Sequence, residues 1–382
     1  KLTHRADGCQ QPPAGGPPAS VGARAERGTV RVRLTPRRPL RILPVNPNPE
    51  GGTMAANLDV LLLLALPASG KSEVRRYLAT LSPDTCRDEF GIGPTTQLDD
   101  FPYVHLMRRI SDEVTVRGQE GPFFLSPALP FREPRDWGTL IELLNEDHVD
   151  LTRPPAPEPE SAARWLFARL DAARARVGAC PAVSRLDPGL RLEVAAALED
   201  ECRALWNDRR GVAPGYGTQE AVENRTVLLE FARGGADGSP LPLPAPYGYR
   251  YSLGCLDHDI LARAAILYVW VTPEESRRKN TERADPDDPG SILHHGVPRA
   301  VMYGDYGCDD FNWLLEQSDV PDTVRVEKDG RSYHLPVGRF DNRADLTTFV
   351  REDQERWSPE HVQALHGGLR EAFTALQRAR GR

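Results

Sequence analysis

The strongest constraint on the fold is the stretch "LDVLLLLALPASGKSEVRRYLATL", residues 58–81. Leu58–Leu66 is a nearly continuous apolar run, which is typical of a strand buried on both faces of a parallel sheet. After a short loop, apolar residues recur at helical spacing: Val74, Tyr77, Leu78 and Leu81. The stretch therefore predicts a buried strand, a tight loop and a helix that begins at Gly70.

The loop "ASGKS" has the chemistry of a phosphate-binding loop, because Gly-Lys-Ser between a buried strand and a helix is the setting of that motif. Its backbone N–H groups and the helix N-terminus would surround a phosphate. Lys71 would reach the β- and γ-phosphates of ATP, and the Ser72 hydroxyl would bind Mg²⁺. The predicted nucleotide-binding residues are Ala68, Ser69, Gly70, Lys71, Ser72 and Glu73. Ala65 stands where the motif has its first glycine, and it removes no N–H donor, so we expect only a change in loop shape.

Further strands and helices alternate along the chain. Strands are predicted at 95–101, 225–235 and 264–273, and another within Gly121–Pro130. The last of the three runs into a helix that begins "EESRRKN". This alternation predicts an α/β protein with a three-layer fold around a parallel sheet.

The chain divides into three predicted regions. Residues 1–53 hold nine prolines and a net charge of +6, so the rest of the chain carries −13. We interpret this arm as disordered, with Met54 as the natural start. Residues 54–310 form the α/β domain, with a helical insertion at 161–211. Residues 311–382 add a small C-terminal extension, a hairpin with its turn at Asp329–Gly330 and a helix capped by Ser358, both packed on the core.

Three acidic residues follow predicted strands, where ligands bind in open α/β sheets. Asp99 and Asp100 stand in "LDDFPY", and a carboxylate there can take the proton of an attacking hydroxyl. The alternative is an Asx-turn or a helix N-cap. Glu230 ends the buried run "TVLLE" and is predicted to hold Mg²⁺ with Ser72; the alternative is a surface glutamate.

A basic helix follows the strand at 264–273. Arg277, Arg278 and Arg283 offer planar guanidinium groups that can stabilise a transferring phosphoryl group, and the Pro/Asp/Gly-rich tail suggests a mobile lid. The alternative is a solvated helix face. Of His294 and His295 beyond it, His295 is the predicted substrate-facing residue.

The order of these motifs resembles the P-loop kinases, in particular the uridine kinase, phosphoribulokinase and nicotinamide riboside kinase group. The resemblance covers short motifs in about half of residues 58–310, and Phe231 replaces a glycine of the family pattern. The resemblance implies a three-layer P-loop NTPase fold, with Asp99 as the general base and Asp100 as a secondary acid. It also implies that the chain is an ATP- and Mg²⁺-dependent kinase acting on a hydroxyl of a small, nucleoside-like molecule. Alternatives are a polynucleotide 5′-hydroxyl kinase and a non-catalytic nucleotide-binding regulator.

The bulk composition limits the partners. A net charge of −7 makes nucleic acid an unlikely partner, and the longest apolar run is too short to span a membrane. The six cysteines are scattered without a CxxC pair, which favours reduced thiols and a cytoplasmic location. The acceptor and the oligomeric state remain open at this stage.

Overall fold

The computed structural model describes residues 57–151, 153, 156–211, 225–283 and 296–381. Its central element is a six-stranded β-sheet. The sheet has the order β2-β3-β1-β4-β6-β5. Its strands are β1 (Val60–Leu64), β2 (Thr95–Asp99), β3 (Thr226–Phe231), β4 (Ala264–Trp270), β5 (Thr323–Lys328) and β6 (Arg331–Asp341). All neighbouring pairs are parallel except β5 and β6, which are antiparallel. The prediction of an α/β protein with a mainly parallel sheet is confirmed.

Strand β1 lies in the middle of the sheet and every one of its residues is buried. Successive side chains alternate between the two faces. Leu62 and Leu64 join the hydrophobic cluster on one face, and Leu61 and Leu63 join the cluster on the other. The four consecutive leucines therefore reflect helices on both sides of the sheet, as the sequence predicted.

Two sets of helices cover these faces. On one face lie α1 (Lys71–Leu78) and α12 (Pro359–Arg380). On the other face lie α4 (Asp136–Asp150), α7 (Gly248–Cys255), α8 (His258–Leu261) and α11 (Phe311–Glu316). The arrangement is compatible with a three-layer α/β fold.

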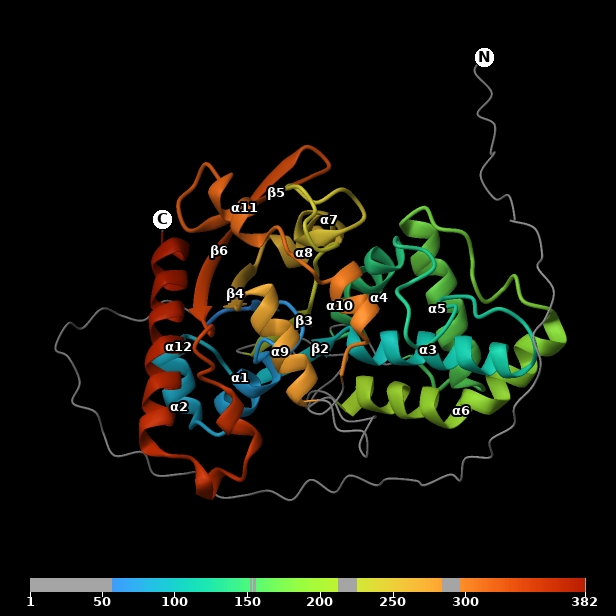
Figure 1. The fold of residues 1–382 in the computed structure, drawn as a ribbon, viewed down its shortest axis with the longest axis horizontal. Helices are drawn as coiled ribbons and strands as arrows, with labels where there is room; N and C mark the ends of the chain where they lie inside the picture. The colour runs from blue at the N-terminus through green and yellow to red at the C-terminus, as the bar shows by residue number, and fades with distance from the viewer. Residues whose placement is uncertain (1–56, 152, 154–155, 212–224, 284–295, 382) are drawn as a thin grey trace, which may run out of the picture. The chain divides into compact units, whose positions relative to one another are not determined.

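A separate helical core forms beside the sheet, from α3 (Phe101–Val116), α4, α5 (Ala162–Arg176) and α6 (Pro188–Gly211). Figure 1 shows these four helices gathered together. A buried carboxylate, Asp147, joins them, since it accepts the Tyr103 hydroxyl (2.8 Å) and pairs with Arg169 (3.0 Å) and Arg209 (2.8 Å). The region predicted as a helical insertion, 161–211, contains α5 and α6, which pack with α3 and α4 in one bundle.

The prediction of a strand within Gly121–Pro130 is wrong, because this segment forms turns. Three prolines remove backbone donors that a strand would need. Phe123 and Phe124 are buried against the helical core, and their N–H groups both donate to Ser111 Oγ (3.1 Å). The apolar run therefore anchors a loop.

The C-terminal region belongs to the main sheet. The predicted hairpin is present, with Asp329 and Gly330 at positive φ in its turn. However, β6 also pairs in parallel with β4, so the hairpin extends the central sheet. Helix α12 begins where predicted, since Ser358 Oγ accepts the His361 N–H (3.2 Å).

The remaining described elements are short: α2 (Pro83–Thr85), the π-helical turn η1 (Cys86–Phe90), α9 (Pro273–Arg283), α10 (Arg299–Gly304), η3 (Thr348–Arg351) and η4 (Gln354–Arg356). Within the described ranges no helix is long and apolar enough to cross a bilayer. Four of the described cysteines, Cys86, Cys202, Cys255 and Cys308, are unpaired. The predicted arm, residues 1–53, lies outside the described residues.

Candidate functional site

The Pro67–Ser72 loop follows β1 at the point where the strand order reverses. From β1 the chain continues to β2, toward one edge of the sheet, whereas from the neighbouring strand β3 it continues to β4, toward the other edge. Ligands bind to α/β sheets at such switch points. Ala68 (φ 56°) and Gly70 (φ 101°) both have left-handed backbone conformations. A Cβ at Gly70 would lie 2.4 Å from Thr347 Oγ1, so glycine is required there by both conformation and space.

Side chains from distant parts of the chain hold the loop carbonyls. Tyr249 donates its hydroxyl to Ala65 O (2.9 Å), and Ser276 donates its hydroxyl to Pro67 O (2.7 Å). With its carbonyls engaged in this way, the loop is shaped by α7 and α9 as well as by its own sequence.

The buried side chain of Asn342, which follows β6, makes a further contact with the loop. Its Nδ2 donates to Ser69 O (2.7 Å) and to Thr347 Oγ1 (2.8 Å), while its Oδ1 accepts the Leu346 N–H (2.7 Å). The C-terminal region, to which no site residue was assigned from sequence, thus holds the loop from outside.

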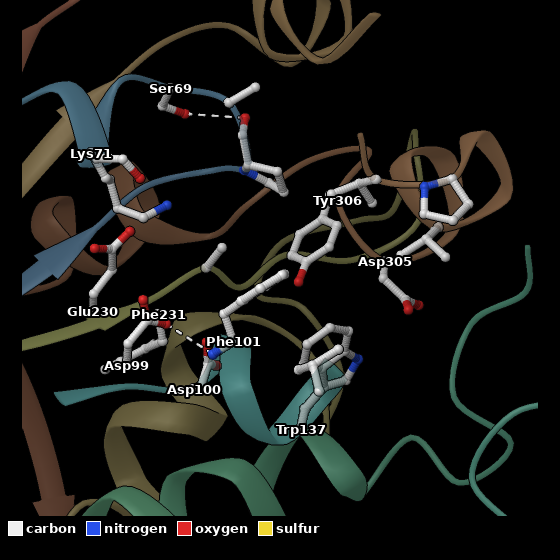
Figure 2. A pocket seen from close by; sticks show the side chains of 18 of the residues that line it. Ser69, Lys71, Asp99, Asp100, Phe101, Trp137, Glu230, Phe231, Asp305 and Tyr306 are labelled. Atoms are coloured by element: carbon white, nitrogen blue, oxygen red, sulfur yellow. Dashed lines mark hydrogen bonds between the residues drawn. The ribbon is translucent and has the colours of Figure 1, made fainter. Parts of the chain in front are cut away.

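The first turn of α1 places Lys71 and Ser72 on a pocket (Figure 2). Lys71 is buried, and its Nζ lies 3.4 Å from the carbonyl oxygens of Ala65 and Leu66. Every residue of the predicted set Ala68, Ser69, Gly70, Lys71, Ser72 and Glu73 lines this pocket. The Glu73 carboxylate is paired with Arg351 (2.6 Å), so Glu73 also ties α1 to the C-terminal region.

Three carboxylates face the same pocket from the ends of β2 and β3: Asp99, Asp100 and Glu230. Asp99 and Glu230 are partners in the β2–β3 register. Burial raises the pKa of Asp99 to about 7, and the charges of Glu230 and Asp100 add to the rise. The Phe101 N–H donates to Asp99 (2.8 Å), which opposes it. Asp99 is therefore a carboxylate that can take up a proton near neutral pH.

Two arginines that sequence reasoning missed neutralise this acidic cluster. Arg75, one turn after Lys71, pairs with Glu230 (2.8 Å) and lies 3.7 Å from Asp99. Arg233, just after β3, is buried and pairs with Asp100 (2.7 Å). Burial raises the pKa of Asp100, and the Arg233 charge opposes that rise. Arg233 also donates to Ser252 Oγ (3.0 Å), which fixes its orientation.

The other end of the pocket is aromatic. Its walls are the rings of Phe101, Phe124, Phe131, Trp137 and Tyr306. Asp305 and Arg108 also line it. Figure 2 shows Asp305, Tyr306 and Trp137 together, on the side away from Lys71, Asp99 and Glu230. None of these aromatic and charged residues was predicted; Phe101 stands in the "LDDFPY" motif, but only the acids of that motif were assigned a role.

The predicted arginine clamp does not line the pocket in the described part of the chain. Arg277 pairs with Glu274 (3.1 Å) and lies over the Tyr303 ring (4.8 Å). Arg278 pairs with Glu275 and Glu282 (both 2.5 Å) on the exposed side of α9. Arg283 is the last residue of α9, and its side chain is not described; His295 lies outside the described residues. Arg278 therefore lies on a solvated face of the helix, which is the alternative interpretation of this basic segment.

A divalent cation is compatible with the donors present. No cluster of three metal-binding side chains exists among the described residues, but Mg²⁺ commonly takes one or two protein oxygens and keeps its waters. Ser72 and Glu230 both line the pocket, and Glu230 Oε2 is buried with no hydrogen bond despite its ion pair.

No protein-family model, no curated protein and no solved structure matches this chain. The functional assignment therefore depends on the geometry of the pocket.

Proposed function

We propose that the protein is an ATP-dependent kinase that transfers the γ-phosphate to a hydroxyl group of a small molecule. One observation carries the proposal: a single pocket is lined at one end by Lys71 and Ser72, and also by Asp99, a partly buried carboxylate at the end of β2. Phosphoryl transfer requires a binding site for the phosphate donor and, close to it, a group that accepts the proton of the acceptor hydroxyl. Lys71 and Ser72 would supply the first and Asp99 the second.

Each residue has a defined part in the proposed reaction. The N–H groups of the Ala68–Ser72 loop and the Lys71 ammonium bind the phosphates. Asp99 accepts the proton of the acceptor hydroxyl while the hydroxyl oxygen bonds to the terminal phosphorus. The bond between that phosphorus and the bridging oxygen breaks, and ADP leaves. Arg233 pairs with Asp100 (2.7 Å) and its charge opposes the rise in the pKa of Asp100, so we assign the proton of the acceptor hydroxyl to Asp99.

Ser72 and Glu230 are the residues that would hold Mg²⁺, which supplies neutralisation of the phosphate charge when bound. Arg75 already pairs with Glu230, and its side chain would share Glu230 with the ion. The Phe101–Tyr306 end of the pocket would exclude water from the acceptor.

A screen for acceptor-dependent phosphoryl transfer tests the proposal. The protein is incubated with Mg²⁺–ATP and a panel of nucleosides, sugars and vitamins, and phosphorylated products are detected by mass spectrometry. We expect one class of product from the wild type, a loss of transfer in Asp99→Asn with nucleotide affinity kept, and no change in Asp59→Asn at an exposed position. Equal transfer by Asp99→Asn and the wild type would contradict the role of Asp99, and no transfer to any acceptor would contradict the proposed function.

A further inference from the structure

A buried carboxylate in the aromatic end of the pocket has no partner that accounts for it. Asp305 is 4% exposed, and its Oδ2 is buried without a hydrogen bond among the described residues. Leaving a carboxylate oxygen buried and unpaired costs free energy, and native proteins seldom do so without a reason. The residue lines the pocket, so a bound molecule can reach the space beside it.

The neighbouring cation does not satisfy this carboxylate. The Arg108 guanidinium donates to Pro127 O (2.7 Å) and lies 4.1 Å from the centroid of the Phe124 ring. Within the described ranges no ion pair joins Arg108 to Asp305. Burial raises the pKa of Asp305 to about 7, and the charge of Arg108 only moderates that rise.

The walls around Asp305 suit a flat ring. Phe131 packs edge-on against Trp137 (4.9 Å between centroids), and Trp137 packs edge-on against Tyr306 (5.4 Å). Such rings offer both faces and edges to a planar ligand at little cost in conformational entropy. Val301 and Pro298 of the α10 region complete an apolar enclosure.

We propose that this end of the pocket is a recognition subsite for a planar ring that carries an amino group, and that Asp305 accepts the hydrogen bond of that amino group. The hydroxyl to be phosphorylated lies at the other end of the same molecule, at Asp99. This part of the inference depends on the proposed kinase function, whereas the binding of the amino-bearing ring does not.

Two pairs of nucleosides that differ only in the exocyclic amino group test the subsite. The pairs are adenosine and purine riboside, and cytidine and pyrimidin-2-one riboside. Affinity is measured by calorimetry at pH 8, where Asp305 is ionised. In at least one pair, we expect the wild type to bind the amino member about 10- to 100-fold more tightly, as a charge-assisted hydrogen bond provides.

Variants of Asp305 assign the preference to this residue. Asp305→Asn keeps the shape of the side chain and is expected to reduce the preference to within about threefold, and Asp305→Ala to abolish it. Asp112→Asn is the matched control, because Asp112 also acts on the charge of Arg108 but does not line the pocket. Its preference should equal that of the wild type. Melting temperatures show whether each variant is folded.

The outcomes separate this inference from the proposed function. Equal binding within both pairs, an unchanged preference in both Asp305 variants, or binding of none of the four nucleosides would overturn the subsite. ADP binding and phosphoryl transfer are measured on the same samples. An Asp305-dependent preference without transfer would support the subsite and contradict the kinase, whereas transfer without the preference would do the reverse.

Discussion

The burial of Asp305 sets a pH dependence for the stability of the protein. Its pKa is about 7 in the folded state and near 3.8 when exposed, so the folded protein holds the proton to a higher pH than the unfolded chain. This residue's contribution to stability is present below about pH 4 and is lost as the pH rises to about 7.

We therefore expect Asp305→Asn to gain stability relative to the wild type between pH 4 and pH 8, by at most about 4 kcal/mol. The measurement is the free energy of unfolding in urea at both pH values, taken as the difference between variant and wild type. This difference removes the contribution of other buried acids, such as Asp136 and Asp309. A constant difference at the two pH values would show that Asp305 is not held in a raised-pKa environment.

Lys71 gives a second prediction for a single residue. Lys71→Ala removes the ammonium that would stabilise the transferring phosphoryl group, so transfer to the acceptor found by screening should fall by about two to three powers of ten, roughly 3–4 kcal/mol. Lys328→Ala, outside the pocket, is the control. A Lys71→Ala variant with normal turnover would remove Lys71 from the reaction.

Single residues also show where sequence reasoning stopped. The sequence predicted five site residues because each stands at the end of a strand or the start of a helix. The structure brings all five to one pocket: Lys71, Ser72, Asp99, Asp100 and Glu230. Arg75 and Arg233 flank the same motifs, and an unpaired acidic cluster could have prompted a search for them. Nothing in the sequence around Asp305 indicates that its carboxylate is buried.

At the scale of elements, the segment from β6 to η3 controls the Pro67–Ser72 loop. Asn342 donates to Ser69 O, and Thr347 fills the space beside Gly70. Arg351 of η3 pairs with Glu73 of α1, and Arg76 of α1 donates to the Arg351 carbonyl (3.0 Å). Loop and segment are joined by side chains that lie more than 250 residues apart in the sequence.

We expect Asn342→Ala to weaken ATP binding about tenfold, because it frees the Ser69 carbonyl and loosens the loop. Asn145→Ala is a matched control: Asn145 is equally buried in α4 and bonds to Cys255 O (2.9 Å), away from the pocket. Both variants should melt at lower temperature, but only Asn342→Ala should change the dissociation constant, measured with a fluorescent ATP analogue. Equal affinities in the two variants would reduce Asn342 to a structural role.

The elements differ in how well the sequence predicts them. Strands β1, β3 and β4 are buried on both faces, so their composition alone identifies them. Helices α3 and α4 were not predicted; the apolar residues of α3 serve the helical core, and those of α4 are divided between that core and the sheet. The segment Gly121–Pro130 is apolar because its buried side chains anchor a loop, not because it forms a strand. An apolar run shows burial but not backbone conformation.

At the scale of the whole molecule, the described residues after 310 are part of the α/β unit. β6 pairs with β4 along five residues, and α12 packs its buried stripe on the sheet. Motifs placed the end of the core near residue 310, because no recognisable chemistry follows. Pairing between β4 and β6 cannot be deduced from either strand alone, since many apolar strands would fit the same edge.

A truncation tests this integration. Removal of residues 311–382 takes away β6 and so exposes the edge of β4. It also removes α12, which uncovers apolar residues on that face of the sheet, among them Leu267 and Val269 of β4. Unpaired edges and large apolar patches cause association of chains. We expect the truncated chain to lose its cooperative thermal transition and to aggregate, while removal of Gly381 and Arg382 alone leaves the melting temperature unchanged. Circular dichroism and size-exclusion chromatography measure both properties. A monomeric, cooperatively melting chain that ends at residue 310 would show that the rest of the protein folds without the C-terminal region.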